Sequence, residues 1–485
     1  MFRDRPLLFT WALPLLLAAC AQVAPSKVQR QEPLASSWQA PLPDQPQDLP
    51  HRGQLSELSQ WWQHWQDPTL VALIDAAQAA SPTLDAASAR LDQTHANLQL
   101  AQAMLGPNVD ASLSSNRGRQ TMIYGTPIAT VTQARVGAAW ETDLFGQNRA
   151  LRDAASQRRQ GAQAAWHEAR VSLAADVANL YLSHRACVTA LSFQREDTAS
   201  RAITARLTQA LADAGFATAT SATLARSAVA ESNARMRQQR ALCDIDVKGL
   251  VALTGLPEPE LRRKLIPASQ GTGQESGQTL AQPPMLAVAS IPAIALAQRP
   301  DLFQAERQVA AASAELGSAQ AERYPKLTLN GAIGQMNMRM GSTVFDLSTW
   351  SVGPVTLSVP LWDNGRFAAH MAETTARYEE AAANYRAKAR QAVREVEEAL
   401  VNLDSARGRL ADLQSAASGY QAMYQGTHQR HQQGLAPLSE LEDTRRTLLS
   451  AQSALIAQQR DTQRAWVALY RAVGGGWTPA LAQNN

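Results

Sequence analysis

The sequence lacks several features on which whole classes of protein depend. Beyond the first twenty residues it contains no window of about twenty apolar residues, so we expect no helix of the mature chain to cross a bilayer, and any crossing must use strands. The formal net charge is only +3 and no basic run is interleaved with aromatic residues, which argues against a nucleic-acid partner. Aromatic residues make up 6% of a chain rich in Ala, Gln, Leu and Arg, a composition that favours long helices.

Catalytic and metal-binding motifs are also missing. The chain has no glycine-rich phosphate loop, no GxSxG pattern and no HExxH pattern. His428 and His431 share one helical face, but no Cys, Asp or third His stands beside them at ligand spacing, so we interpret them as polar surface. The sequence therefore predicts neither an enzyme nor a metal site.

The N-terminus predicts export and a lipid anchor. Arg3 and Arg5 precede an apolar run from Leu7 to Leu17, which is typical of a signal peptide over residues 1–19. The following Leu-Ala-Ala-Cys resembles the lipobox of bacterial lipoproteins, in which Cys20 is acylated and begins the mature chain. The alternative is a chance cysteine after an ordinary signal peptide. Because Ala21 is not the aspartate that retains lipoproteins at the inner membrane, we expect a proline-rich tether over residues 20–60 that starts from outer membrane lipid.

An internal duplication organises the rest of the chain. Three anchor regions match one another at nearly constant shifts of 217 to 219 residues: Ser81–Leu84 with Arg299–Leu302, Asp143–Arg149 with Pro360–Arg366, and Gly215, Arg226 and Gly255 with Gly434, Arg445 and Gly474. The segment between the copies is rich in Gly, Ser, Gln and Pro and has no hydrophobic period. We therefore predict a first repeat over residues 61–262, a linker over 263–290, and a second repeat with a C-terminal tail over 291–485.

Each repeat is expected to contain a helix, a β-hairpin and then a long helical hairpin. Apolar and polar residues alternate in four short segments, near residues 109–114, 134–141, 327–333 and 355–359, as expected for strands with one apolar face. Such strands suit either a membrane barrel or a soluble, half-buried sheet, and Pro354 is unusual inside the fourth one. The fold class is thus α+β and mainly α.

The helical segments are long and carry heptads. Apolar residues recur every seven positions in two of them, at Leu441, Leu448, Leu455 and Leu469 and at Val229, Met236, Cys243 and Leu250. No proline interrupts the chain from Gln147 to about Asp213, so one helix could reach about 100 Å at 1.5 Å per residue. We expect packed helices in a long rod or tube.

A sheet of four strands cannot close on itself in a membrane, so copies of the chain must share a barrel. At this point the chain resembles the TolC-like outer membrane efflux family, in particular the lipoprotein branch typified by OprM and NodT, over about residues 61–477. The resemblance is carried by the duplicated hairpins, by the stretch Gly353–Gly365 that is similar to the family's fourth strand and exit turn, and by the closing Gly474–Trp477.

This resemblance implies a homotrimer with a shared twelve-stranded β-barrel and a coiled-coil α-helical tunnel across the periplasm. It implies a passive channel for drugs or other small molecules, anchored in the outer membrane, with a periplasmic adaptor and an inner-membrane transporter as partners and no cofactor besides the lipid on Cys20. Two alternatives remain open: a type I protein secretion duct with the same architecture, and a periplasmic coiled-coil scaffold that forms no channel.

The two cysteines that remain after processing are expected to pair. If the first helical hairpin turns at Gly215, Cys187 and Cys243 each lie 28 residues from the turn, on opposite sides of it, and so stand level on antiparallel helices. Both also occupy apolar seams, and an oxidising periplasm favours a disulfide between them. The alternative is two buried free thiols.

The remaining candidate residues lie at the hairpin turns. Gly215 with Phe216, and Gly434 with Leu435, resemble the family's adaptor-contact tips, although a glycine is also what a helix end needs for a left-handed residue. By resemblance, the periplasmic gate falls on Glu440, Asp443 and Arg446, with His431 where relatives often have a tyrosine. Acidic residues also favour the first turn of any helix, so those two acids have an alternative explanation in a helix that begins near Pro437.

Overall fold

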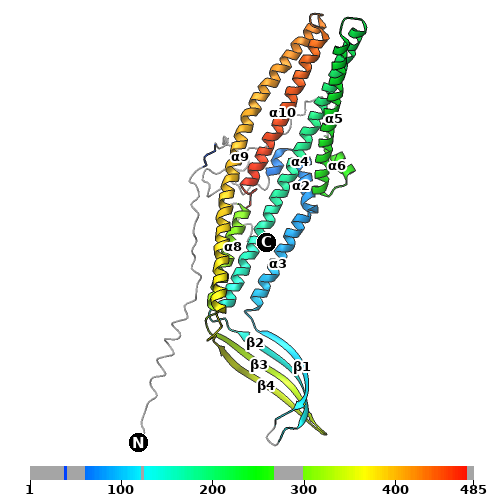
Figure 1. Ribbon diagram of the computed structural model, residues 1–485. Helices are drawn as coiled ribbons and strands as arrows, with labels where there is room; N and C mark the ends of the chain where they lie inside the picture. The colour runs from blue at the N-terminus through cyan, green and yellow to red at the C-terminus, as the bar shows by residue number, and fades with distance from the viewer. Residues whose placement is uncertain (1–37, 41–60, 122–124, 267–295, 297–298, 478–485) are drawn as a thin grey trace. The chain divides into compact units, whose positions relative to one another are not determined.

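A computed structural model describes residues 38–40, 61–121, 125–266, 296 and 299–477 of the chain (Figure 1). These residues form two compact units. The sheet unit contains Ala89–Gln163 and Gln304–Ala387, and the hairpin unit contains the described parts of Pro33–Ser88, Ala164–Phe303 and Lys388–Asn485. The two copies of the duplication contribute to both units, because each copy passes from a strand pair into a long helical hairpin.

The element order repeats once along the chain. In order the elements are α2 (Pro68–Ala80), α3 (Pro82–Ala103), β1 (Asn108–Arg119), β2 (Ile128–Glu141), α4 (Gln147–Asp213), α5 (Ala219–Thr254), α6 (Glu258–Leu265), α8 (Pro300–Ala321), β3 (Lys326–Met340), β4 (Thr343–Ser358), α9 (Arg366–Gln432) and α10 (Leu438–Ala472). The predicted sequence of helix, β-hairpin and helical hairpin is confirmed in both copies. None of the helices in these described ranges combines the length and the apolar character that crossing a membrane requires.

The sheet is antiparallel throughout, in the order β1-β2-β3-β4. Its register places the apolar positions of neighbouring strands side by side, so that Ala111 pairs with Val136, Val136 with Ile333, and Ile333 with Trp350. Because side chains alternate between the two faces, these residues form one apolar row across all four strands. β1 and β4 are the two edge strands of the sheet within one chain.

A bulge in β4 accommodates the proline that the sequence places inside this strand. Leu329 pairs with Val355 and Gly331 with Val352, so β4 has one residue more than β3 between these two pairs. Pro354 lies in this bulge, and its carbonyl accepts a hydrogen bond from the side chain of Asn330 at 3.1 Å. A proline has no N–H to offer a ladder, and a bulge removes the need for one.

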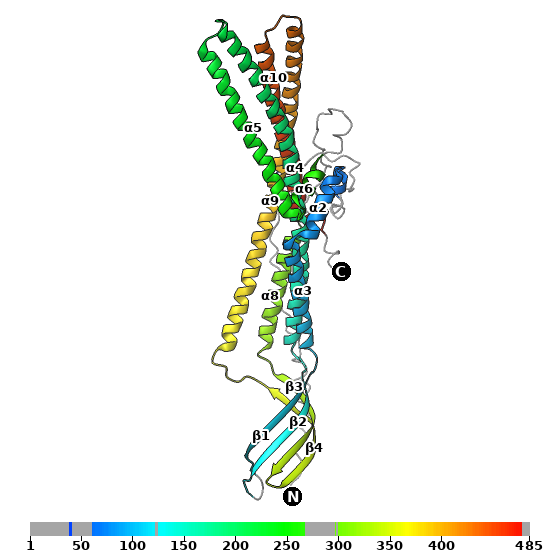
Figure 2. The ribbon, with the colours of Figure 1, turned by 90° about the vertical axis from the view of Figure 1, so that its right-hand side faces the viewer.

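The hairpin unit contains most of two long antiparallel helix pairs, α4 with α5 and α9 with α10, which lie side by side in Figures 1 and 2; α4 and α9 begin in the sheet unit. α4 and α9 each contain 67 residues, about 100 Å of helix at 1.5 Å per residue. The bounds of α4 agree with the proline-free segment of the sequence. An aromatic cluster of Trp61, Trp62, Trp65 and Tyr470 packs the start of the first copy against the end of α10.

Two boundaries differ from those that the sequence predicts. α6 ends at Leu265, whereas the sequence analysis ends the first repeat at residue 262; Leu261 is fully buried and basic residues occupy the last turn of the helix. The initial helix of the first copy is two helices, since α2 ends before Pro82, which starts α3. The predicted linker over 263–290 lies outside the described residues beyond position 266.

Candidate functional site

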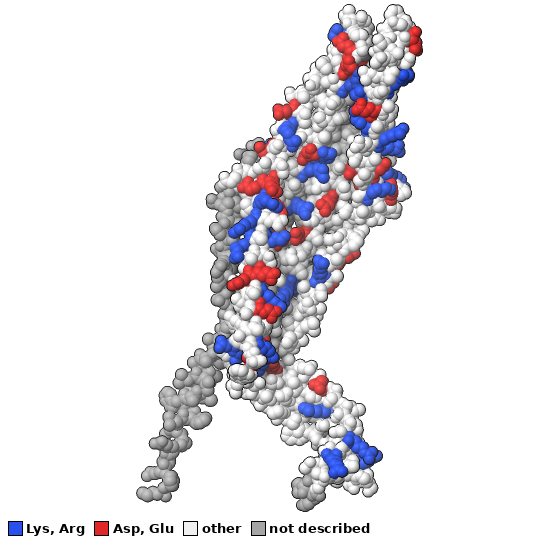
Figure 3. All heavy atoms as spheres, in the orientation of Figure 1, with Lys and Arg blue, Asp and Glu red and all other residues white. Residues whose placement is uncertain are grey.

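The apolar face of the sheet is exposed in the single chain. Among its side chains, Leu113 is 77% exposed, Trp350 78% and Val352 90%. The opposite face carries Ser112, Arg135 and Thr349 in one cross-strand row. A soluble, half-buried sheet would have its apolar side chains covered, so this exposure favours the membrane interpretation of the strands. Figure 3 shows few charged side chains on the sheet and an interspersed mixture of both signs on the helical hairpins.

The two hairpin turns have the same backbone geometry. Gly215 and Gly434 adopt left-handed φ angles of 80° and 74°, which a glycine tolerates without strain. The amide that follows each glycine donates to a helix carbonyl five residues back, from Phe216 to Leu211 and from Leu435 to Arg430, both at 2.8 Å. Phe216 is 83% exposed and Leu435 66% exposed. The predicted tips therefore present an apolar side chain to the surroundings.

The acidic residues near the second turn are ion-paired within the chain. Glu440, in the first turn of α10, contacts Arg430 of α9 at 2.8 Å, and the same arginine donates to the Leu435 carbonyl at 3.4 Å. Arg430 is a partner that the sequence interpretation missed. Its position four residues before Gly434, with Glu440 six residues after it, places the two charges across the turn from one another, and this signal was present in the sequence.

Asp443 forms an ion pair with Arg446, one turn further along α10. Arg446 also donates to two hydroxyls of α4, to Thr204 at 3.1 Å and to Ser200 at 3.4 Å. The second hairpin is thus joined to the first by Arg446, which the family resemblance predicts to lie at the gate. The imidazole of His431 lies 2.9 Å from the carbonyl oxygen of Ala436, and this hydrogen bond closes the second turn.

A second polar group near this turn is buried and was not predicted. Glu442 is only 2% exposed and pairs with Arg445 at 3.2 Å, while Arg445 donates to the hydroxyl of Tyr424 on α9 at 3.0 Å. The hydrogen bond to Tyr424 raises the pKa of the Arg445 guanidinium, and the charge of Glu442 acts in the same direction. This group joins α10 to α9 close to Glu440 and Asp443, the predicted gate residues.

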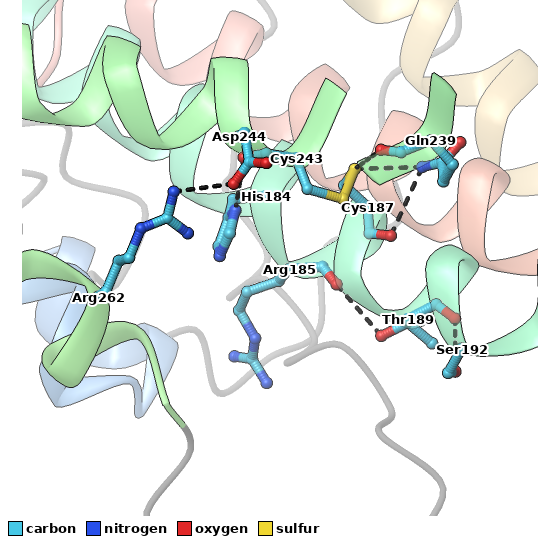
Figure 4. The surroundings of a disulfide bond; sticks show 9 residues. All are labelled: His184, Arg185, Cys187, Thr189, Ser192, Gln239, Cys243, Asp244 and Arg262. Carbon is cyan, nitrogen blue, oxygen red and sulfur yellow. Dashed lines mark hydrogen bonds and ion pairs between the residues drawn. A yellow bond between two sulfur atoms is a disulfide. The ribbon is translucent and has the colours of Figure 1, made fainter. Parts of the chain in front are cut away.

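Cys187 and Cys243 are joined by a disulfide between α4 and α5 (Figure 4). Their Cα atoms lie 5.5 Å apart, as level positions on antiparallel helices predict. Gln239 donates to Cys187 Sγ at 3.1 Å, and the ring of His184 lies 3.3 Å from the carbonyl of Cys243. Burial lowers the pKa of His184, although the hydrogen bond to Cys243 opposes this effect.

Comparison with known proteins assigns the family. The model of the family described as outer membrane efflux protein matches residues 73–256 and 291–475, which are the two copies of the duplication. The chain belongs to the outer membrane efflux protein family. It is 28% identical over 476 residues to the outer membrane protein OprJ of Pseudomonas aeruginosa, with coverage of 96% of this chain and 95% of OprJ. It is 27% identical over 481 residues to the toluene efflux pump outer membrane protein TtgC of Pseudomonas putida, with coverage of 97% and 95%.

Solved structures superpose on this protein over nearly its whole length. A membrane protein from Pseudomonas aeruginosa superposes with a TM-score of 0.78 at 26% identity, covering 93% of this chain and 99% of that one. The outer membrane channel OprN superposes with a TM-score of 0.77 at 25% identity, covering 92% and 99%. The fold is therefore that of the TolC-type outer membrane channels, and the protein is an outer membrane efflux channel component.

Two further predictions concern the lipid anchor and metal binding. Cys20 lies outside the described residues. Within the described ranges, no group of three or more His, Cys, Asp or Glu residues is arranged to hold a metal ion. His428 lies with its ring 6.0 Å from that of Tyr424, on α9.

Proposed function

We propose that this protein is the outer membrane subunit of an efflux pump and provides a passive path for small molecules out of the cell. The exposed apolar face of the four-stranded sheet carries this proposal, because such a face requires lipid or another apolar cover. The names of its relatives support a small-molecule cargo: one belongs to a toluene efflux pump and another to pyoverdine export. No contact among the residues that the structure describes favours a protein cargo.

The channel forms from three copies of the chain. One copy offers four strands and two unpaired edges, β1 and β4, and an open edge is not tolerated in lipid. Three copies related by a threefold axis would join these edges into a twelve-stranded barrel, with the helical hairpins continuing the wall in the periplasm. The tube itself supplies no energy for transport.

The partners would act at the tips of the helical hairpins and at the outer membrane. A periplasmic adaptor would meet the tips, where Phe216 and Leu435 are exposed beside glycines of fixed geometry. An inner-membrane transporter would load the tube through that adaptor. At the other end, lipid on Cys20 would hold the chain at the outer membrane. Labelling with palmitate should mark the wild type and not Cys20→Ser, and equal labelling of both would remove the anchor from the proposal.

The gate would be the ring that threefold symmetry makes from Glu440 and Asp443. Three copies of each carboxylate around one axis repel one another unless cations or arginines offset them. Arg430 and Arg446 are placed to do so, since they already pair with these acids in one chain. Opening would then break Arg446 contacts with α4.

Single-channel recording in planar bilayers tests the channel and the gate together. Replacing Glu440 and Asp443 by Ala should raise conductance and lower the preference for cations, because the ring loses its charge. The matched control replaces Ser221 and Leu224 of the first copy, which occupy the equivalent positions, by Ala and should leave both quantities unchanged. A protein that never conducts would contradict the channel, whereas equal currents in all three proteins would contradict only the gate position.

A further inference from the structure

The disulfide has a non-covalent counterpart in the other copy of the duplication. At a shift of 219 residues, Cys187 corresponds to Ala406, Cys243 to Thr462 and Gln239 to Gln458. Gln458 donates to the Ala406 carbonyl at 3.1 Å and Thr462 to the same carbonyl at 3.4 Å. Both copies therefore join their two helices at this level through a glutamine, which is half-buried in the first copy and buried in the second, but only the first copy adds a covalent bond.

A second link between helices, nearer the turn, is also confined to the first hairpin. Asp197 of α4 accepts hydrogen bonds from the hydroxyl of Ser232 of α5 and from Arg201, each at 2.9 Å, and Thr198 lies 2.8 Å from that hydroxyl. Ser232 is completely buried. The equivalent residues of the second hairpin are all alanines, at positions 416, 417 and 451. Alanine side chains cannot form hydrogen bonds, so these positions of the second hairpin do not form this link.

The contacts of the second hairpin near its turn are all non-covalent. Arg430 with Glu440 and Arg445 with Tyr424 join α9 to α10. α10 in turn contacts α4 of the first hairpin, where Ile456 packs on Ala186. The second hairpin can therefore separate or shift by exchanging hydrogen bonds with water, whereas the first cannot separate beyond its disulfide without a reductant.

We propose that the Cys187–Cys243 disulfide is a lock that prevents α4 and α5 of the first hairpin from separating. The second hairpin, which has no such bond, is then the one that moves against the first. This inference rests on the proposed function, since only a gated channel requires one fixed and one moving hairpin. The segment between the lock and the turn contains 28 residues on each side of Gly215, about 42 Å of helix. Its two helices are joined at one end by the disulfide and at the other by the turn. The lock keeps the α4 surface that α10 contacts in one arrangement while the gate opens.

The duplication allows the lock to be moved from one hairpin to the other. In the swapped variant, Cys187 and Cys243 become Ala, while Ala406 and Thr462 become Cys. The new pair has the same sequence separation of 56 residues as the native pair. Intact mass with and without reductant establishes that each protein carries its bond. The unlocked control carries only the two Cys→Ala changes.

Single-channel recording on these full-length proteins should show which of the two hairpins must move for the channel to open. The oxidised swapped variant should open at least tenfold less often than the same protein after reduction, while wild type and the unlocked control open in both conditions. Equal opening of the swapped variant before and after reduction would overturn the proposal. So would a wild type in which only reduction permits opening.

Hydrogen exchange provides a readout that does not depend on conduction. Loss of the native bond should raise amide exchange in the part of α4 and α5 between the cysteines and Gly215 by about tenfold or more, and exchange in α9 and α10 should change less. Unchanged exchange in α4 and α5 would refute the lock even if every variant conducts. If no protein conducts, the proposed function fails, and the exchange comparison still decides whether the disulfide restrains this hairpin.

Discussion

Arg299 should be the side chain whose loss most weakens the junction of α8, α9 and α10. It is 6% exposed and immediately precedes α8. Its guanidinium donates to the Asp301 carboxylate at 2.8 Å and 3.0 Å, to Glu395 at 2.7 Å and to the carbonyl of Ala472 at 2.7 Å. One side chain therefore joins the start of α8 to α9 and α10 within the hairpin unit.

The charges of this group depend on one another. Burial acts to raise the pKa of Asp301, but its hydrogen bonds and ion pair with Arg299 outweigh burial and hold that pKa below its usual value. Glu168 of α4 shows the opposite case, because burial and the nearby Asp301 charge raise its pKa. The ion pair thus stabilises the fold at neutral pH. Because the pKa of Asp301 is lowered, this contribution should be lost only as the pH falls below the ordinary pKa of an aspartate and through the lower pKa of folded Asp301.

Replacing Arg299 by Met keeps the length of the side chain and removes every donor. Asp301 and the Ala472 carbonyl would then remain buried without their partner, and breaking a buried ion pair in this way typically costs about 3–5 kcal/mol. Glu395 contributes less, since its side chain is 33% exposed and can turn to water. The control is Arg377→Met on α9, where Arg377 and Glu373 are both more than half exposed and the expected loss is below about 0.5 kcal/mol.

Hydrogen exchange of the full-length protein measures the difference locally. Arg299→Met should speed exchange of the amides at the start of α8 by about a hundredfold or more, and Arg299→Lys should have a smaller effect because it keeps the charge but loses the planar fork. If Arg299→Met and Arg377→Met changed exchange equally, the reasoning from burial would be wrong.

Three further changes have expected outcomes. Glu397→Ala should expose the segment 38–40 to protease, because the Glu397 carboxylate accepts both the Gln39 and the Ala40 amide at 2.7 Å; Glu397→Gln should retain part of the protection, and no change in cleavage would contradict the contact. Burial lowers the pKa of His167 to about 4, so the folded state favours neutral histidine and stability should fall as the pH drops from 6.5 toward 4, by about 1 kcal/mol at pH 5 after discounting for partial exposure; His167→Asn should remove this slope in pH-dependent unfolding. Gly475→Ala should destabilise the end of α10 by more than about 2 kcal/mol in the same assay. The φ angle of Gly475 is +62°, and a methyl group there would lie 2.5 Å from a Val171 methyl. A loss of stability below about 1 kcal/mol would refute the clash.

Features that repeat along the chain could be predicted from the sequence. Alternating apolar and polar residues predicted both strand pairs, the duplication predicted a long helical hairpin in each copy, and the absence of proline from Gln147 to Asp213 predicted the bounds of α4. The pairing of Cys187 with Cys243 followed from counting residues on either side of Gly215. In each case a local rule, a helix rise or a turn residue, determines the position of distant residues once the turn is known.

Contacts that depend on side-chain direction could not be predicted in the same way. Glu442 and Asp443 are neighbours on α10, yet Glu442 is buried against Arg445 while Asp443 is mostly exposed. Successive residues of a helix point about 100° apart, so this difference depends on which side of α10 meets α9, and sequence spacing alone does not give that angle. The bulge at Pro354 was signalled by the proline itself, but the strand that absorbs the extra residue depends on the register.

Comparison of the two copies distinguishes features that the backbone requires, such as the turn geometry, from contacts that depend on the side chains. Both turns keep a glycine with the same left-handed φ and the same hydrogen bond across five residues, because a chain that reverses between two long helices has few other solutions. The links between the helices have no such constraint and have diverged. A disulfide and the Asp197 group with buried Ser232 join the first pair. In the second pair, Ala406 and Thr462 replace the cysteines, alanines replace the Asp197 group, and charged side chains lie at the turn. Two hairpins of one geometry therefore differ in how easily their helices separate, and this difference is carried by a few side chains rather than by the fold.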